Sequence, residues 1–189
     1  AVIIMEVIAI NGQPRTELGK KGSKAVRKEE QIPCVLYGPG FSEHFSTEIT
    51  NVRHLIYTPD FKVADVIIGD NKYRCIVKNV QYHPVSEKIL HIDFLMLKDG
   101  HPVKVEVPLR FTGTALGVKG GGKLQQKVRR VKIKTVPETL ITELKLDISN
   151  LDMGQSIRIR DIVPPKNVEI LNAPSTPVAT IDIPRALRS

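Results

Sequence analysis

The stretch "VADVIIGDNKYRCIVKNVQ" (residues 63–81) decides the fold class of this chain. Two runs rich in β-branched residues flank Gly69-Asp70-Asn71, a pattern that predicts two antiparallel strands joined by a tight turn. Similar runs recur along the chain, at residues 1–10, 89–97, 104–111, 129–136, 142–149, 155–163 and 177–183. In one of them Pro108 favours an edge or bulge position, because proline has no N–H to donate to a neighbouring strand.

Helical signals are confined to two stretches. Residues 19–30 suit one helix, and residues 50–57 suit a short one with Thr50 or Asn51 as its N-cap and Pro59 as its stop. The predicted fold class is therefore mainly β, of the α+β type, with two short helices.

Composition indicates a globular protein with an acidic partner. The chain has 189 residues, of which 41% are hydrophobic and 25% are charged, enough for one large domain or two small ones. Its net charge of +8 is most simply explained by a nucleic-acid partner. Aromatic residues make up only 5%, with no Trp. Backbone and shape contacts are therefore expected rather than a base-stacking platform.

Several features place the chain in the cytoplasm. Cys34 and Cys75 each lie inside an apolar run, which is typical of small buried residues in a reducing compartment. The opening "AVIIMEVIAI" has no basic leader and is too short to span a membrane. We interpret it as a first strand and expect no membrane partner.

A domain boundary is expected at the "KDGH" turn (residues 98–101). Residues 1–97 hold 12 Lys and Arg against 11 Asp and Glu, whereas residues 98–189 hold 16 against 9. We therefore expect one domain over residues 1–97 and a second over residues 98–189. Because the first half is nearly neutral, a local cluster of positive charge within it is informative.

That cluster is "RTELGKKGSKAVRK" (residues 15–28), in which six of fourteen residues are Lys or Arg. On a helix at 100° per residue, five of them fall within about 120° of arc, namely Lys20, Lys21, Lys24, Arg27 and Lys28. Gly22, Ala25 and Val26 occupy the opposite side. A solvated helix face usually mixes charges of both signs, whereas a phosphate surface would offset the repulsion among five like charges. RNA binding is the favoured interpretation, with a solvated face as the alternative.

The stretch "QYHPVSEKILHID" (residues 81–93) allows more than one chemistry. His91 and Asp93 are two positions apart on a predicted strand and share a face. With His83 they could hold a metal or act as general acid and base, or contact RNA phosphates and base edges. No nucleophile motif lies nearby, and "GVKGGGK" (residues 117–123) lacks the spacing of a nucleotide-binding loop.

Two separated motifs, "RTELGKKGSKAVRKEEQIPCVLYG" and "VKNVQYHPVSEKILHIDF", together resemble the family of large-subunit ribosomal protein twenty-five. These are 5S-rRNA-binding proteins related to the Ctc-type general stress proteins. The segments "VEVPLRFTGTALGVKGGGKLQ", "VPETLITELKLDISNLDMGQSIRIRDI" and "VATI" resemble the long form of the same family. The resemblance covers nearly the whole chain.

The resemblance implies an N-terminal six-stranded β-barrel that carries the RNA site, followed by an all-β C-terminal domain. It also implies a structural protein without enzymatic activity, cofactor or metal. This protein would bind the loop E region of 5S rRNA in the central protuberance of the large subunit. Carried over by position, the RNA contacts are Arg15, Lys20, Lys21, Ser23, Lys24, Arg27, Tyr37, Gln81, His83, His91 and Asp93.

A second contact is predicted in residues 113–136, which hold seven basic residues and no acidic one. Its glycines suggest a mobile loop, and the strand after it would place Val131 and Ile133 on one side and basic residues on the other. The expected partner is rRNA or an acidic patch on a neighbouring ribosomal protein, reached through Lys119, Lys123, Arg129, Arg130 and Lys132. The alternative is a solvated strand whose lysines protect a sheet edge.

Two other functions stay open at this point. A stress-induced RNA-binding factor could act partly off the ribosome, as the stress association of the family permits. A metal-dependent enzyme could use His83, His91 and Asp93.

Overall fold

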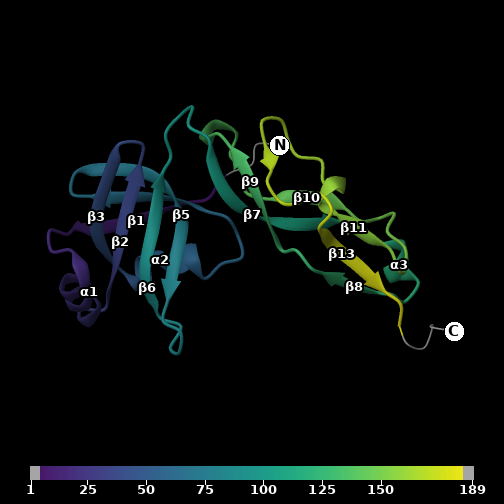
Figure 1. The fold of residues 1–189 in the computed structure, drawn as a ribbon, viewed down its shortest axis with the longest axis horizontal. Helices are drawn as coiled ribbons and strands as arrows, with labels where there is room; N and C mark the ends of the chain where they lie inside the picture. Colours follow the sequence, from purple (N-terminus) through teal and green to yellow (C-terminus); the bar gives the residue numbers. More distant parts are fainter. Residues whose placement is uncertain (1–4, 185–189) are drawn as a thin grey trace. The chain divides into compact units, whose positions relative to one another are not determined.

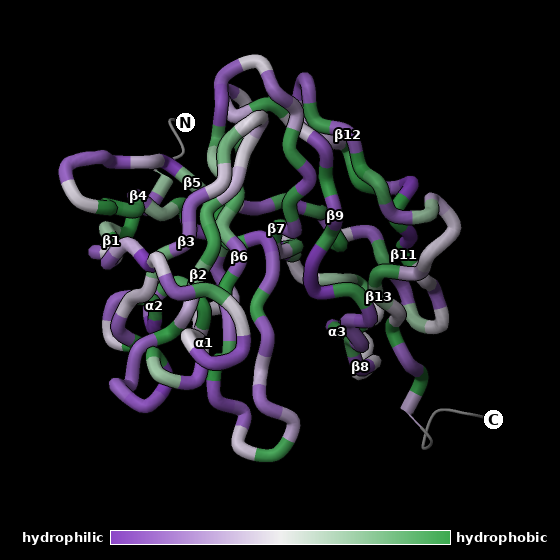
Figure 2. Tube along the Cα trace, turned by 60° about the vertical axis from the view of Figure 1, so that its left-hand side comes forward, coloured by the Kyte–Doolittle hydropathy of each residue, from purple (hydrophilic) through white to green (hydrophobic). Residues whose placement is uncertain are grey.

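The computed structural model describes residues 5–184 and divides the chain into two compact units, Ala1–His101 and Pro102–Ser189 (Figure 1). Each unit has its own buried side chains and sheets. In both, hydrophobic and hydrophilic positions alternate along the strands (Figure 2). The mainly β fold class is confirmed.

The first unit is a closed six-stranded barrel with the strand order β1-β3-β2-β6-β5-β4. Its strands are β1 (Val7–Pro14), β2 (Gln31–Gly38), β3 (Phe41–Glu48), β4 (Val63–Ile68), β5 (Asn71–Tyr82) and β6 (Ile89–Met96). The pairs β1–β4 and β2–β6 are parallel, and the other pairs are antiparallel. The barrel that the resemblance implied is thus present, and the hairpin predicted around Gly69 joins β4 to β5.

The barrel interior is filled by the inward-facing side chains of its strands. Phe45 and Phe94 are fully buried with ring centroids 5.7 Å apart. Gly12 makes room for Phe45, because a Cβ there would lie 2.6 Å from the Phe45 ring. Cys34 and Cys75 are buried free thiols, as expected, and burial raises the pKa of Cys75 to about 12. Both cysteines therefore serve as small core residues.

Two helices lie in the connections of the barrel. Helix α1 (Gly19–Lys28) contacts β2, and α2 (Ile49–Ile56) contacts β1 and β3. The prediction of Thr50 or Asn51 as N-cap of α2 was wrong: the cap is Glu48, and the Thr50 hydroxyl donates to the Glu48 carboxylate instead. Ala25 was also misplaced, because it is exposed, and Gly22 is the buried residue of α1.

The second unit contains two sheets (Figure 1). One has the order β10-β7-β9-β12 and the other the order β11-β13-β8. In chain order the elements are β7 (Val103–Thr112), α3 (Leu116–Lys119), β8 (Lys123–Gln126), β9 (Arg130–Thr135), β10 (Leu144–Asp147), β11 (Ser156–Arg158), β12 (Glu169–Ile170) and β13 (Pro177–Asp182). Two 3₁₀ turns cover Pro137–Thr139 and Ile159–Asp161. The strand predicted over residues 155–163 therefore ends at Arg158.

Pro108 occupies a central strand and not the predicted edge. The N–H of Leu109 donates to the carbonyl of Arg129, directly before β9, so the nitrogen of Pro108, one residue earlier, faces the opposite neighbour, β10. Pairing with β10 begins only at Leu109. The missing N–H of proline thus costs the sheet no hydrogen bond.

Glycines among residues 117–122, where a mobile loop was predicted, permit close packing against neighbouring elements. Added at Gly117, a Cβ would lie 2.5 Å from the backbone nitrogen of Met153. At Gly122 it would lie 2.5 Å from Cγ2 of Ile181. The Gly122 N–H donates to the Gly117 carbonyl at 2.8 Å. This turn therefore holds α3 and β8 against β13.

Candidate nucleic-acid interface

The register of β5, β6 and β2 brings several predicted site residues onto one outer face of the barrel. Gln81 lies opposite His91, and Asn79 lies opposite Asp93. The intervening Ile92 and Phe94 point inward and are fully buried. Tyr37 joins this group from β2 and is close enough to Asp93 that the carboxylate, after burial, raises the pKa of the phenol. We call Tyr37, Asn79, Gln81, His91 and Asp93 the barrel face.

His91 and Asp93 form a close pair at the centre of the barrel face. Nδ1 of His91 lies 2.8 Å from Oδ1 of Asp93. Burial lowers the pKa of His91, and Arg15 and Arg27 lower it further, while Asp93 opposes the shift. At neutral pH the imidazole is therefore uncharged and offers both a donor and an acceptor.

Arg15 lies beside this pair and has an unused donor. Its Nη2 donates to the carbonyl of Glu17 at 3.1 Å, and its backbone N–H donates to the carbonyl of His44 at 3.0 Å. Its Nε is buried and has no partner among the described residues. A buried cationic N–H without an acceptor is costly, and an RNA oxygen would satisfy it.

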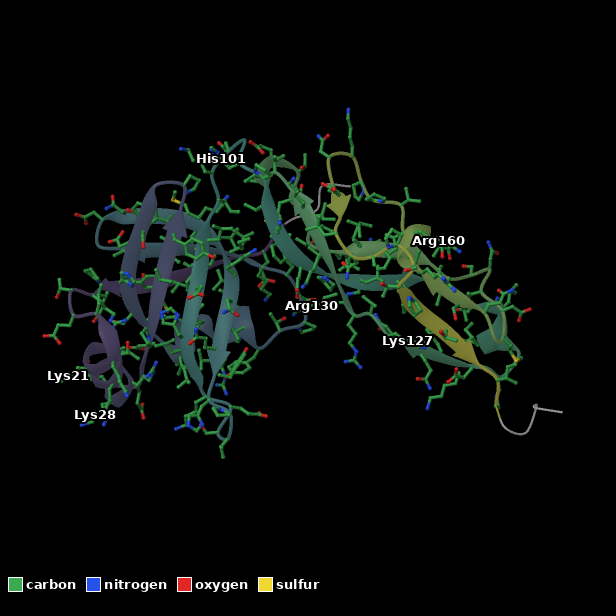
Figure 3. All side chains as sticks on the ribbon, viewed as in Figure 1. Lys21, Lys28, His101, Lys127, Arg130 and Arg160 are labelled. Atoms are coloured by element: carbon green, nitrogen blue, oxygen red, sulfur yellow. The ribbon has the colours of Figure 1, made fainter. Side chains whose placement is uncertain are left out.

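Helix α1 supplies positive charge next to the barrel face. Its four lysines are exposed, and none forms an ion pair within residues 5–184, namely Lys20, Lys21, Lys24 and Lys28. Figure 3 shows Lys21 and Lys28 on the outer side of the helix. Ser23 is half-buried and so less available than the lysines. Gly22 lets the chain before α1 approach closely, because a Cβ there would meet the Glu17 carbonyl oxygen.

Arg27 attaches α1 to the barrel instead of pointing freely outward. Its Nε and Nη2 donate to the carbonyl oxygen of Leu90 at 3.2 and 3.0 Å. Leu90 precedes His91 in β6, so this bond fixes the helix beside the barrel face. Arg27 therefore has a structural task that its helical position did not reveal.

His83 is separate from the His91–Asp93 pair. It lies in the β5–β6 turn, where Nδ1 accepts the N–H groups of Val85 at 3.3 Å and Ser86 at 3.2 Å. Only Nε2 remains for a ligand. Across residues 5–184, no group of three or more His, Cys, Asp or Glu side chains is arranged to hold a metal ion.

Asn79 was missed by the sequence reasoning. It is exposed and lies directly opposite Asp93. The sequence could have pointed to Asn79, because it stands two positions before Gln81 in β5 and therefore shares its face. A bulge between Val77 and Asn79 shifts the register there, and the pattern of residue types does not reveal such a shift.

The residues predicted for a second contact do not form one strand. Lys119 ends α3, Lys123 begins β8, and Arg129 lies in the connection to β9, which belongs to the other sheet. In β9, Arg130 lies opposite Pro108 and Lys132 opposite Glu106, with Nζ of Lys132 3.6 Å from the Glu106 carboxylate. The neighbouring strand β7 thus supplies an acidic partner for Lys132.

Comparison with known proteins matches each unit to a family of ribosomal proteins. The Ribosomal L25p family matches residues 10–94, and the family described as Ribosomal protein TL5, C-terminal domain, matches residues 102–185. Large ribosomal subunit protein bL25 of Cytophaga hutchinsonii is 42% identical over 184 residues, covering 97% of this chain and 95% of its own length. This chain belongs to the bL25 family. The proteins of the same name, bL25, from Porphyromonas gingivalis and Phocaeicola vulgatus are 39% and 35% identical to this chain. Each alignment covers 97% of this chain and 96% of the relative.

The bL25 family consists of structural ribosomal proteins and not of enzymes. The resemblance found in the sequence motifs is thereby confirmed, and the metal-dependent enzyme is set aside. Within residues 5–184, no helix has both the length and the apolar character needed to cross a membrane.

Proposed function

We propose that this chain is a structural component of the large ribosomal subunit that binds the loop E region of 5S rRNA. The observation that carries the proposal is the attachment of α1 to the barrel face through Arg27 and Leu90. One continuous surface then offers unpaired lysines beside neutral and acidic hydrogen-bonding groups. The names of the relatives support the ribosomal location.

The two parts of this surface suit different parts of an RNA. Regular A-form RNA hides its base edges in a deep, narrow groove, whereas non-Watson–Crick pairs alter the groove and expose other groups. The lysines of α1 supply contacts with phosphates, which position a protein without reading sequence. Gln81, His91 and Asp93 sit on rigid strands and can discriminate among exposed donors and acceptors.

Gel-shift titration of the full chain against 5S rRNA tests the proposal, with intact loop E and with loop E replaced by Watson–Crick pairs. The variant Lys20→Ala/Lys24→Ala should bind intact 5S rRNA more weakly. Each lost phosphate contact flattens the dependence of log K on log[salt] by roughly 0.7–0.9, so the double variant should flatten it by about 1.4–1.8.

The matched control is Lys98→Ala/Lys166→Ala, which removes the same charge from two exposed positions outside α1 and the barrel face. It should retain the affinity and the salt slope of the unmodified chain. Equal binding of intact and altered loop E by the unmodified chain would refute the proposed target. Equal behaviour of the two double variants would show that α1 is a solvated face.

A further inference from the structure

The outer face of the three-stranded sheet in the second unit is polar, and β8 forms an edge of this sheet, with no other strand paired to that side among the described residues. In the register of β8 and β13, Gln125 lies opposite Thr180, and Ser156 in β11 lies opposite Thr180 from the other side. Alternate residues point the other way: Leu124, Ile157 and Ile181 pack into the core cluster around Ala115 and Leu151. We call Lys123, Gln125, Lys127, Ser156 and Thr180 the β8 face.

The positive charge of this region is not balanced in the way that the charge of β9 is. Four basic residues follow one another along α3, β8 and the next connection, all exposed and without an ion pair in the described chain: Lys119, Lys123, Lys127 and Arg129. The acidic residue nearest in register is Asp182, opposite Lys123. By contrast, Lys132 in β9 is paired with Glu106 and Lys145 in β10 with Glu143.

The β8 face is also held rigidly. The Lys127 N–H donates to the Val178 carbonyl at 2.8 Å, and Ser156 Oγ lies 2.9 Å from Thr180 Oγ1. The close approach at Gly117 and Gly122 fixes the other end of β8. Lys123 at the start of β8 and Lys127 directly after its end are therefore held on ordered backbone, at the edge of the sheet where Lys127 is labelled in Figure 3.

We propose that the β8 face binds the sugar-phosphate backbone of RNA, as a contact separate from the barrel face. Lys127 lies four positions after Lys123, about 13 Å along an extended backbone, so the two side chains would reach different phosphates. Gln125 and the hydroxyls of Ser156 and Thr180 lie among them and can bond to phosphate or 2′-hydroxyl oxygens. None of these residues is aromatic or apolar, which argues against base stacking and against the anchors typical of protein interfaces.

The inference rests on the proposed function in one respect: the RNA is taken to be ribosomal RNA because the chain is proposed to be a ribosomal component. Its test uses full-length protein and large subunits from which the chain has been removed. Binding of labelled Lys123→Glu/Lys127→Glu is compared with binding of Lys98→Glu/Lys166→Glu, which makes the same charge change elsewhere. The β8 variant should bind at least fivefold more weakly than the control, while its melting temperature stays that of the control.

Lys123→Gln/Lys127→Gln is a milder second variant, in case charge reversal perturbs the sheet. It should flatten the salt dependence by about 1.4–1.8, the value for two phosphate contacts. Equal affinity of β8 and control variants for the depleted subunits would overturn the proposal.

A photoreactive residue identifies the molecule that the β8 face touches. With Gln125→benzoylphenylalanine, irradiation of the reconstituted subunit should cross-link the chain to RNA. A cross-link only to protein would overturn the assignment, and so would the absence of any cross-link. Failure of the unmodified chain to bind free 5S rRNA would instead refute the proposed function, so the two failures are distinguishable.

Discussion

The guanidinium of Arg27 donates two hydrogen bonds to the backbone carbonyl oxygen of Leu90, 63 positions further along the chain. The bond joins the one strongly basic helix of the barrel unit to the strand that carries His91 and Asp93. The basic groups and the hydrogen-bonding groups of the proposed RNA-binding surface are thereby held in a fixed mutual orientation, which would reduce the ordering cost of that binding.

Arg27→Ala should weaken 5S rRNA binding more than Lys20→Ala does, although each removes one charge. The reason is that α1 also loses its attachment to β6. The free energy of unfolding in urea should fall by roughly 0.5–1.5 kcal/mol, the usual range for such a hydrogen bond. Arg27→Lys should recover only part of both losses, because an ammonium cannot reproduce the planar two-nitrogen contact. Identical effects of Arg27→Ala and Lys20→Ala would contradict the anchoring role.

His91→Ala and Asp93→Ala should reduce discrimination between intact and altered loop E by roughly 1–3 kcal/mol, if these side chains read base edges. Their effect on the salt slope should be smaller than that of the α1 lysines. The measurement is parallel titration of both RNAs at several salt concentrations. A uniform loss of affinity on both RNAs would make the pair structural, orienting its neighbours on the barrel face.

The lowered pKa of His91 predicts a pH dependence of stability. Between that lowered pKa and the ordinary value of about 6.5, the unfolded chain binds more protons than the folded chain. The contribution of His91 is therefore fully present above pH 6.5 and is lost as pH falls through the lowered pKa. Urea unfolding from pH 7.5 to pH 5 should show a steeper loss for the unmodified chain than for His91→Asn. If the free energy of unfolding falls equally steeply with pH in both proteins, the pKa of His91 is not lowered by folding.

His83 should act through the β5–β6 turn. His83→Ala removes the acceptor of the Val85 and Ser86 N–H groups, so exchange of those two amides should become faster. His83→Asn should restore much of their protection, because asparagine side chains accept hydrogen bonds from the backbone two residues ahead. Amide exchange followed by NMR gives the answer, and unchanged rates in His83→Ala would show that the imidazole does not hold the turn.

A fragment of residues 1–97 should fold alone and keep most of the affinity for 5S rRNA. The barrel has all its strand edges paired within these residues, and every residue of α1 and the barrel face lies inside them. Circular dichroism and gel-shift titration of the fragment, beside a fragment of residues 1–101, check this. An unfolded fragment, or one that binds far more weakly than the full chain, would mean that the C-terminal residues support the site.

Local patterns in the sequence predicted the elements whose residues suffice to define them. The β4–β5 hairpin and the two barrel helices are examples. Strands β2 and β3 were not predicted as strands, because Pro33 interrupts one and the other, "FSEHFSTE", is largely polar. In the structure Ser46 and Thr47 are buried, and their hydroxyls donate to Gln31 and to the Asn11 carbonyl. Such residues look like surface positions until the strands that satisfy them are known.

The residues of the candidate site divide in the same way, into those that local patterns predict and those that depend on distant strands. The α1 lysines could be found because helical geometry is local. The Arg27–Leu90 bond and the Lys132–Glu106 pair could not, because each depends on which distant strands become neighbours. Within the basic segment of residues 113–136, the local pattern could not reveal that Lys132 pairs with Glu106, because Glu106 belongs to β7, which lies outside the segment.

Closure of the barrel has a consequence for the order of events during synthesis. Strand β1 must pair with β4, and β2 must pair in parallel with β6, the last barrel strand to be made. A nascent chain leaving the exit tunnel from its N-terminus therefore cannot close the barrel until Met96 has emerged. Until then β2 and β5 each keep an unpaired side, and Arg27 has no Leu90 to bind. The surface proposed for 5S rRNA is thus complete only after the last barrel strand has been made.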